Sequence, residues 1–171
     1  MSDSGPGLAD QLAVAAVLLL VLLAAYLLMW RGWRRRARKH DLPELPAVGE
    51  TAGTSVLAGE GRYFGTTVSG QWLDRVVARG LGARSEVFLS LTNGGVDVVR
   101  PAGSFRIPAA ALRGARHDLG IAGKVVPPHG LLVVTWRHGG HVLDTGFRLR
   151  APAEHETWVR AIDEMVREDA A

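Results

Sequence analysis

Four histidines are the side chains of this chain that could form a metal site. They are His117, His129, His138 and His141, and a Gly-Gly pair separates the last two. Imidazole is a common zinc ligand, but a protein zinc site needs about three or four ligands in a fixed geometry. Two histidines that flank a tight turn lie at the end of a hairpin and still need another ligand. We therefore expect solvent-exposed turn histidines, with no metal and no other cofactor.

One aspartate, Asp144, could be a catalytic carboxylate. It lies in Val-Leu-Asp-Thr-Gly, and two apolar residues before Asp-Thr-Gly are similar to the active-site strand of aspartic proteases. That chemistry needs two carboxylates that share a proton, which a second copy of the chain could supply. Only 25 residues follow Gly146, too few for the rest of such a protease, and Phe147 replaces the usual small residue. We expect an ordinary strand with an outward-facing Asp144 and no enzyme; an anchored hydrolase is the alternative.

Other chemistry is absent from the sequence. There is no G-x-G-x-x-G or Walker motif, since the pair Gly80 and Gly82 lacks the spacing and the following helix. The chain has no cysteine, which excludes thiolate metal sites and a disulfide framework.

The basic residues are concentrated in one short segment. Residues 31–40 hold six basic residues and no acid, whereas residues 41–171 hold fourteen basic and fifteen acidic residues. The six are Arg31, Arg34, Arg35, Arg36, Arg38 and Lys39. The remainder of the chain is therefore not a basic nucleic-acid binder, and we expect no nucleic acid as a partner.

The most distinctive stretch is Leu12 to Trp30, nineteen residues without a charge or an amide side chain. A helix of that length rises roughly 28 Å, close to the thickness of a bilayer's hydrocarbon core. We predict a single transmembrane helix over residues 12–30, after a tail of residues 1–11. A buried helix of a soluble core is the alternative, as is a cleaved secretory signal, which would need a basic start and a shorter apolar run.

The charges around this helix predict its orientation. Because the six basic residues follow it and residues 1–10 hold no Lys or Arg, the N-terminus is expected outside and the rest in the cytoplasm, at the plasma membrane. The basic juxtamembrane segment, residues 31–40, then contacts anionic lipid headgroups, each charge contributing about 1 kcal/mol.

Residues 41–61 are rich in proline and glycine and predict a flexible linker. The domain after it, residues 62–168, contains short β-rich runs separated by turn signals, which is typical of a small antiparallel sandwich or barrel. Seven strands are predicted, at residues 62–68, 85–91, 96–100, 104–107, 113–119, 131–138 and 142–150. Residues 71–78 have the spacing of a short amphipathic helix, 109–112 predict a helical turn, and 120–130 predict a loop.

A final helix is predicted from Pro152, with Trp158, Ile162 and Met165 on one apolar stripe that caps the sheet. The predicted fold is therefore mainly β, with one N-terminal transmembrane helix and a seven-stranded barrel capped by a C-terminal α-helix.

This order resembles the pleckstrin-homology (PH) superfold, in which two nearly orthogonal sheets form a barrel closed at one end by a helix with a buried tryptophan, here Trp158. Residues 10–168 are similar to an actinobacterial family of single-span proteins with a bacterial PH-like domain. The segments that carry this resemblance are GVDVVRP, GIAGKVV, VVTWRHG, LDTGFR and AEHETWVRAIDEMV. Members are often catalogued as transport or export proteins, but one helix cannot enclose a permeation path.

The resemblance implies a binding module. Eukaryotic PH domains bind phosphoinositides through a K-x-R-like pattern near the first hairpin, where this chain has Arg75, Arg79 and Arg84 without that spacing. We expect a non-enzymatic module that recruits or scaffolds an unidentified protein partner, through an exposed sheet edge or the loop at 120–130. Sensing of anionic lipid is the alternative. Small residues in the span leave self-association open, and no G-x-x-x-G is present.

Overall fold

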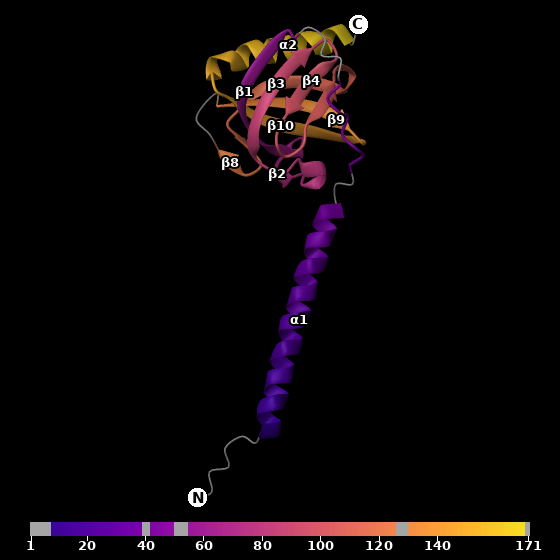
Figure 1. The fold of residues 1–171 in the computed structure, drawn as a ribbon, viewed down its shortest axis with the longest axis vertical. Coiled ribbons are helices and arrows are strands. Elements are labelled where there is room, and N and C mark those ends of the chain that lie inside the picture. Colours follow the sequence, from indigo (N-terminus) through magenta and orange to yellow (C-terminus); the bar gives the residue numbers. More distant parts are fainter. Residues whose placement is uncertain (1–7, 39–41, 50–54, 126–129, 170–171) are drawn as a thin grey trace, which may run out of the picture. The chain divides into compact units, whose positions relative to one another are not determined.

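The computed structural model describes residues 8–38, 42–49, 55–125 and 130–169. It divides into two compact units, Met1–Lys39 and His40–Ala171, which are described separately. Figure 1 shows a single helix in the first unit and a β-rich domain in the second.

The first unit is one helix, α1 (Leu8–Arg38, 31 residues). Its segment Val14–Gly32 has a mean hydropathy of 2.3, and none of that segment is buried in the protein. The predicted helix is therefore present, and by length and composition it can cross a membrane. A core helix of a soluble protein would instead be mostly buried. Of the predicted membrane-surface residues, Arg31 is exposed and Arg34, Arg35, Arg36 and Arg38 belong to the last turns of α1, while Lys39 lies outside the described residues.

The second unit is built on seven antiparallel strands in the order β5-β4-β3-β1-β10-β9-β6. Their bounds are β1 (Leu57–Val68), β3 (Ser85–Thr92), β4 (Gly95–Val99), β5 (Phe105–Pro108), β6 (Leu112–Asp118), β9 (Leu131–His138) and β10 (His141–Leu149). All seven predicted strands are confirmed. The end strands β5 and β6 do not pair with each other, so hydrogen bonds do not close the barrel.

The predicted helix at residues 71–78 is wrong. Gln71–Arg75 forms a strand, β2, that pairs with the end of β1, and a short 3₁₀ turn, η1 (Ala78–Gly80), follows it. The reason is that Gly70 turns the chain back with a φ of 78°, so that the free edge at the end of β1 supplies pairing partners. Tertiary pairing overrides local periodicity in such short segments.

The predicted loop at 120–130 contains a small hairpin. It consists of β7 (Gly120–Ile121) and β8 (Lys124–Val125), while residues 126–129 lie outside the described residues. Gly123 in its turn has a φ of 73°, a conformation that glycine adopts readily. The second predicted helical turn is present as η2 (Ala109–Ala111).

Part of the predicted flexible linker, residues 41–61, is packed against the domain. Leu42 is buried, and its carbonyl accepts a hydrogen bond of 3.0 Å from Arg79 Nε. The carbonyl of Pro46 accepts one of 2.8 Å from the Arg106 amide. The strand β1 also begins at Leu57, inside the predicted linker. Proline and glycine prevent regular structure in residues 42–49, but they do not prevent packing, so this segment is a strap along the domain.

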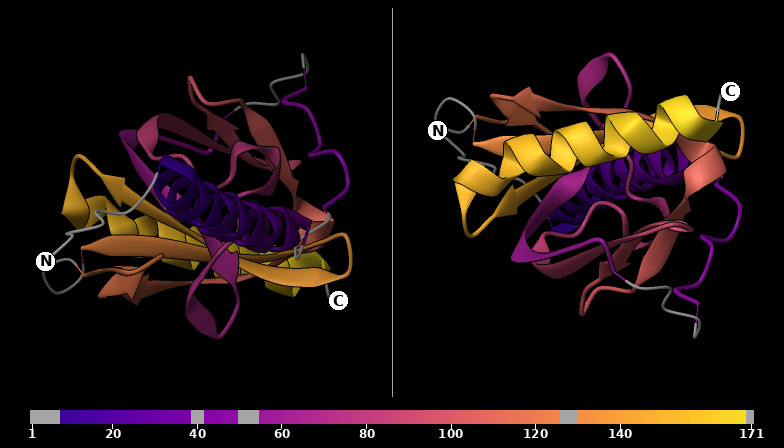
Figure 2. Two further views of the ribbon diagram at one scale, coloured as in Figure 1. Left: turned by 90° about the horizontal axis from the view of Figure 1, so that it is seen from below. Right: turned by 90° about the horizontal axis from the view of Figure 1, so that it is seen from above.

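The C-terminal helix, α2 (His155–Asp169), follows a 3₁₀ turn, η3 (Pro152–Glu154). It lies across one end of the sheet, as the right view of Figure 2 shows. Trp158 and Ile162 are buried in the main core, and Met165 packs against that core while partly exposed. The helix therefore buries the apolar stripe predicted from its spacing.

A hydrogen-bonded polar chain crosses the core. The Tyr63 hydroxyl lies 2.7 Å from Thr66 Oγ1 and donates to the Leu81 carbonyl at 2.7 Å. Thr66 in turn contacts Thr145, which accepts a hydrogen bond from the Trp136 indole at 2.8 Å. Burial raises the pKa of Tyr63 to about 12, against opposing effects of Thr66 and nearby arginines. The Tyr63 phenol is therefore neutral at physiological pH and acts as a fixed donor that joins β1 to the segment around η1.

Arg100, which directly follows β4, is buried. Its guanidinium lies 4.2 Å from the ring centroid of Tyr63 and 5.2 Å from that of Phe105. It donates to the carbonyls of Gly103 at 2.9 Å and Gly80 at 3.1 Å. Arg100 thus fastens η1 to the turn between β4 and β5.

Candidate functional site

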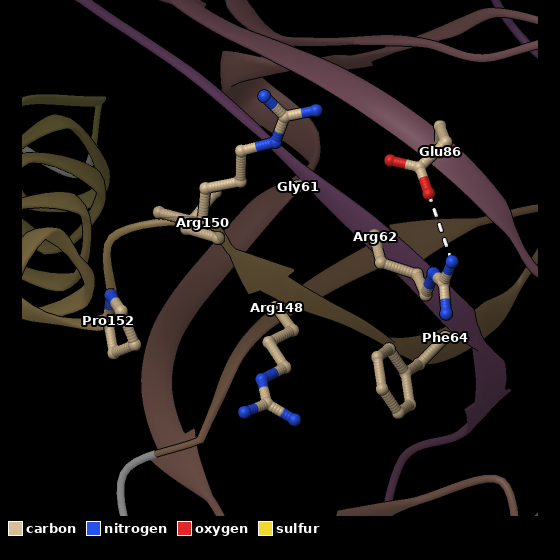
Figure 3. Close-up of a pocket in the computed structure, with 8 residues that line it drawn as sticks. Gly61, Arg62, Phe64, Glu86, Arg148, Arg150 and Pro152 are labelled. Atoms are coloured by element: carbon tan, nitrogen blue, oxygen red, sulfur yellow. Dashed lines mark hydrogen bonds and ion pairs between the residues drawn. The ribbon is translucent and has the colours of Figure 1, made fainter.

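An open pocket of about 410 Å³ lies on the outer face of β1, β3 and β10. Figure 3 shows the side chains around it. We call it the arginine pocket, and it is lined by Gly61, Arg62, Phe64, Glu86, Arg148, Leu149, Arg150 and Pro152.

Strand register brings three of these charges into one row. Arg62 on β1 is directly opposite Glu86 on β3 and directly opposite Arg148 on β10. Arg62 and Glu86 form an ion pair of 3.0 Å between exposed side chains. Two like charges directly opposite each other on neighbouring strands destabilise a sheet unless an anion lies between them. The row therefore has more positive charge than its own carboxylate neutralises.

Arg148 carries the positive charge that Glu86 does not neutralise. Arg150 pairs with Glu60 at 3.0 Å, whereas Arg148 makes no hydrogen bond or ion pair with any residue that the structure describes. In Figure 3 its side chain extends from β10 and no dashed line reaches it. Guanidinium groups bind carboxylates and phosphates through two parallel hydrogen bonds. Arg148 is thus available for an anionic ligand.

The remaining lining is apolar. Phe64, Leu149 and Pro152 contribute it, and the Arg84 guanidinium lies 4.1 Å from the ring centroid of Phe64. A second depression of about 410 Å³ shares Glu86 and Arg150 with the arginine pocket and continues over the exposed cross-strand pair Phe88 and Val99. The combined surface suits a ligand with both an anionic and an apolar part.

The lining offers binding groups rather than catalytic ones. Among the residues that the structure describes, the single carboxylate in the lining, Glu86, is engaged with Arg62, and no serine, histidine or lysine lines the pocket. General acid–base or nucleophilic catalysis needs such a group within hydrogen-bond reach of the substrate. The geometry therefore supports anion recognition.

The arginines singled out in the sequence do not converge on this pocket. Arg75 donates to the carbonyls of Gly82 and Ala122, and Arg79 donates to that of Leu42, so both hold loops of the domain. Arg84 contacts the pocket only through Phe64. Sequence reasoning missed Arg62 and Arg148, because residues 86 positions apart become neighbours only through the register of β1 and β10.

The histidines do not form a metal site within the described residues. His138 and His141 are paired across the hairpin between β9 and β10, and His138 Nε2 lies 3.2 Å from the Pro43 carbonyl. His117 instead contacts Glu156 of α2 at 2.9 Å. His129 lies outside the described residues.

Asp144 is held in a buried ion pair. Its carboxylate accepts hydrogen bonds from Arg116 at 2.9 Å and from Thr135 at 2.7 Å, which joins β10 to β6 and β9. Burial alone would raise the pKa of Asp144, but the hydrogen bonds from Arg116, Thr135 and Ser69 hold it below its usual range. The residues opposite it on the neighbouring strands are Thr67 and Thr135, not a second carboxylate. Leu143, Thr145 and Phe147 of β10 point into the core, so Asp144 faces outward as predicted, but Arg116 reaches over it from β6 and buries it.

We expect Asp144→Asn to lower the free energy of unfolding at pH 7 by about 1–2 kcal/mol, a value reduced because Arg116 stays partly solvated. The folded pKa lies below the unfolded value of about 3.9, so this contribution is fully present above about pH 4. It is lost as the pH falls through the folded pKa. Urea unfolding from pH 7 down to pH 3 should show the wild type and the variant converging in acid; a constant difference would contradict the ion pair.

The end strands of the sheet are partly covered. On β5 the Arg106 amide donates to Pro46 of the strap, and on β6 the Ala115 amide donates to Asp163 Oδ1 of α2 at 2.9 Å. Strand addition by a partner needs a row of unpaired amides and carbonyls. A sheet edge is therefore a poorer contact surface here than sequence reasoning expected.

Comparison with known families gives one match to a family model, described as bacterial PH domain-like, over residues 42–163. This match begins at the buried Leu42 and contains the strap, the whole sheet and most of α2. Among curated proteins, no match is found.

Proposed function

The chain belongs to the bacterial PH domain-like family, and from this premise we propose that it is a membrane-anchored, non-enzymatic binding module that holds an acidic protein segment at the inner face of the plasma membrane. The span and the basic segment, which lie outside the matched residues, further support placing the whole chain with the actinobacterial single-span proteins that carry this domain.

The observation that carries this proposal is that Arg148 has no hydrogen-bond or ion-pair partner among the described residues. A guanidinium in register with another arginine, beside Phe64 and Leu149, suits a carboxylate next to an apolar side chain. An acidic peptide segment presents both groups together. Salt would weaken such binding, because the pocket is open to solvent.

Arg148 lies far along β10 from the point where the chain enters the domain. Pro43, close to the point where the chain leaves for the anchor, lies against Gly139 in the turn that precedes β10. Arg148 is seven residues beyond His141 on β10, about 24 Å along an extended strand. The arginine pocket therefore lies away from the part of the domain that the anchor holds.

We expect Arg148→Glu to weaken partner capture about tenfold, since loss of a hydrogen bond to a charged group costs roughly 1.5–3 kcal/mol. A photoreactive amino acid at position 86 of the full-length protein would record the partner in native membranes. The matched control is Arg160→Glu, because Arg160 is an exposed arginine of α2 that is paired with Glu156. Adducts of equal yield in wild type and Arg148→Glu would refute the proposal that the partner binds in the arginine pocket.

Sensing of anionic lipid is the second candidate, favoured by the basic segment that follows the span. The same photoreactive position separates the two candidates. Adducts with a protein support recruitment, and adducts with phospholipid that depend on Arg148 support lipid sensing.

The orientation of the chain is part of the proposal. The absence of Lys and Arg before α1 and the six basic residues after Trp30 support an N-terminus outside the cell. A tag placed after Ala171 should be protected from protease added to intact cells, whereas a tag before Met1 should be cleaved. Cleavage of the C-terminal tag alone would reverse the topology.

A further inference from the structure

The strands β2 and β8 lie at the same end of the domain (Figure 1), and large apolar side chains of their hairpins and of the adjoining Leu119 are exposed there. The exposed fractions are 48% for Trp72, 67% for Leu73, 52% for Leu119 and 74% for Val125. We call these four residues the apolar tip. Scattered exposed apolar residues are common on proteins, but a contiguous group marks a contact surface.

The apolar tip is contiguous. A Cβ placed on Gly120 would lie 3.7 Å from the Trp72 ring, and one on Gly123 would lie 3.8 Å from Leu73. Between the two hairpins is an open hollow of about 330 Å³ that is lined by Trp72, Leu119 and Val125, together with Asp118 and Gly120. The hairpins thus form one surface.

Among the described residues, one acid lines this hollow, Asp118, and it is already engaged. Asp118 Oδ1 accepts hydrogen bonds from the amides of Leu119 at 2.7 Å and Gly120 at 3.3 Å, and Oδ2 pairs with Arg116. Lys124, in the same hairpin, is exposed and basic. The surface is therefore apolar with a basic residue beside it, and its acid is compensated.

The apolar tip is on the side of the domain where the chain enters. Arg75 of β2 donates to the Ala122 carbonyl in the turn between β7 and β8. Arg79, four residues later, donates to the carbonyl of Leu42. Arg75 thus joins the two hairpins, and η1, which follows β2, contacts the first buried residue after α1.

The segment between α1 and the domain is short. Residues 39–41 alone separate Arg38, the last residue of α1, from Leu42. Four residues of extended chain span at most about 14 Å. The six helical residues after Gly32 add about 9 Å. Leu42 is therefore never more than about 23 Å from the end of the apolar segment.

We propose that the apolar tip inserts into the headgroup boundary of the bilayer that anchors the chain. Tryptophan is enriched at that depth, and apolar side chains next to basic ones bind anionic bilayer surfaces. The bilayer is the occupant because the tether keeps this side of the domain within its reach. The inference goes beyond partner recruitment and does not depend on Arg148.

The chain has no cysteine, so single-cysteine labelling tests this directly. Leu73→Cys and Leu119→Cys, each labelled with nitrobenzoxadiazole, would be reconstituted as full-length protein in vesicles of phosphatidylcholine and phosphatidylglycerol. Glu164→Cys, on the exposed face of α2, is the matched control. With lipids that carry a nitroxide near the headgroup, quenching should be several times stronger at positions 73 and 119 than at 164.

A second variant tests whether the quenching depends on the apolar tip and not on the apolar label itself. Trp72→Glu in the Leu119→Cys background should reduce quenching to the level of position 164, with an unchanged circular dichroism spectrum. Equal quenching at all three positions would overturn the proposal. So would blue-shifted emission that nitroxide lipids do not quench, because a second copy of the chain would then cover the apolar tip.

Discussion

Trp158→Ala is expected to lower the free energy of unfolding of the domain by about 3–5 kcal/mol, the cost of removing a large buried aromatic side chain together with the cavity that it leaves. Trp158 is 1% exposed and belongs to the main core. Its indole also lies against Gly59 at the start of β1, so α2 would lose its contact with that strand.

Met165→Ala is the matched comparison on the same face of α2. Met165 packs against the core but is partly exposed, so its truncation should cost only about 1 kcal/mol. Urea unfolding of the full-length variants in detergent, followed by circular dichroism of the strands, measures both. Equal costs would contradict the description of α2 as a helix anchored by Trp158.

Arg100→Leu is expected to cost about 2–4 kcal/mol, because the carbonyls of Gly80 and Gly103 lose their donor and the cation over the Tyr63 ring disappears. Hydrogen exchange should also increase in residues 78–83, which Arg100 fastens to the turn after β4. Arg100→Lys should recover little, since a lysine cannot reproduce the planar fork of donors.

The control for Arg100 is Arg113→Leu. Arg113 also donates to carbonyls, those of Ala110 and Leu112, but it does so at the surface. Its loss should change the unfolding free energy by no more than about 0.5 kcal/mol. If Arg113→Leu and Arg100→Leu were equally costly, burial would not be the reason for the importance of Arg100.

Elements with a strong local signal could be predicted from the sequence. The apolar run Leu131–His138 became a central strand, the Gly-Gly turn after it became a hairpin, and Pro152 preceded α2 as expected. Each depends on residues within about ten positions of one another. The match to the PH order followed from the sequence of these elements, which the family comparison supports.

The errors and omissions arose where distant residues decide the structure. The apolar spacing of Gln71–Val77 suits a helix, but the end of β1 offers hydrogen-bond partners that a helix would leave unused. The strap at residues 42–49 has the composition of a linker, and only the folded domain supplies the donors that hold it. Arg62 and Arg148 meet through register alone, so no local pattern identifies the arginine pocket.

The partial covering of β5 and β6 has a consequence for aggregation. Sheets with exposed, unpaired edge strands can associate strand to strand into polymers. Pro46 accepts a hydrogen bond from β5 and Asp163 accepts one from β6, so fewer amides of these edge strands are free to pair with another sheet. The domain is therefore less prone to edge-to-edge polymerisation than a sheet with two bare edges.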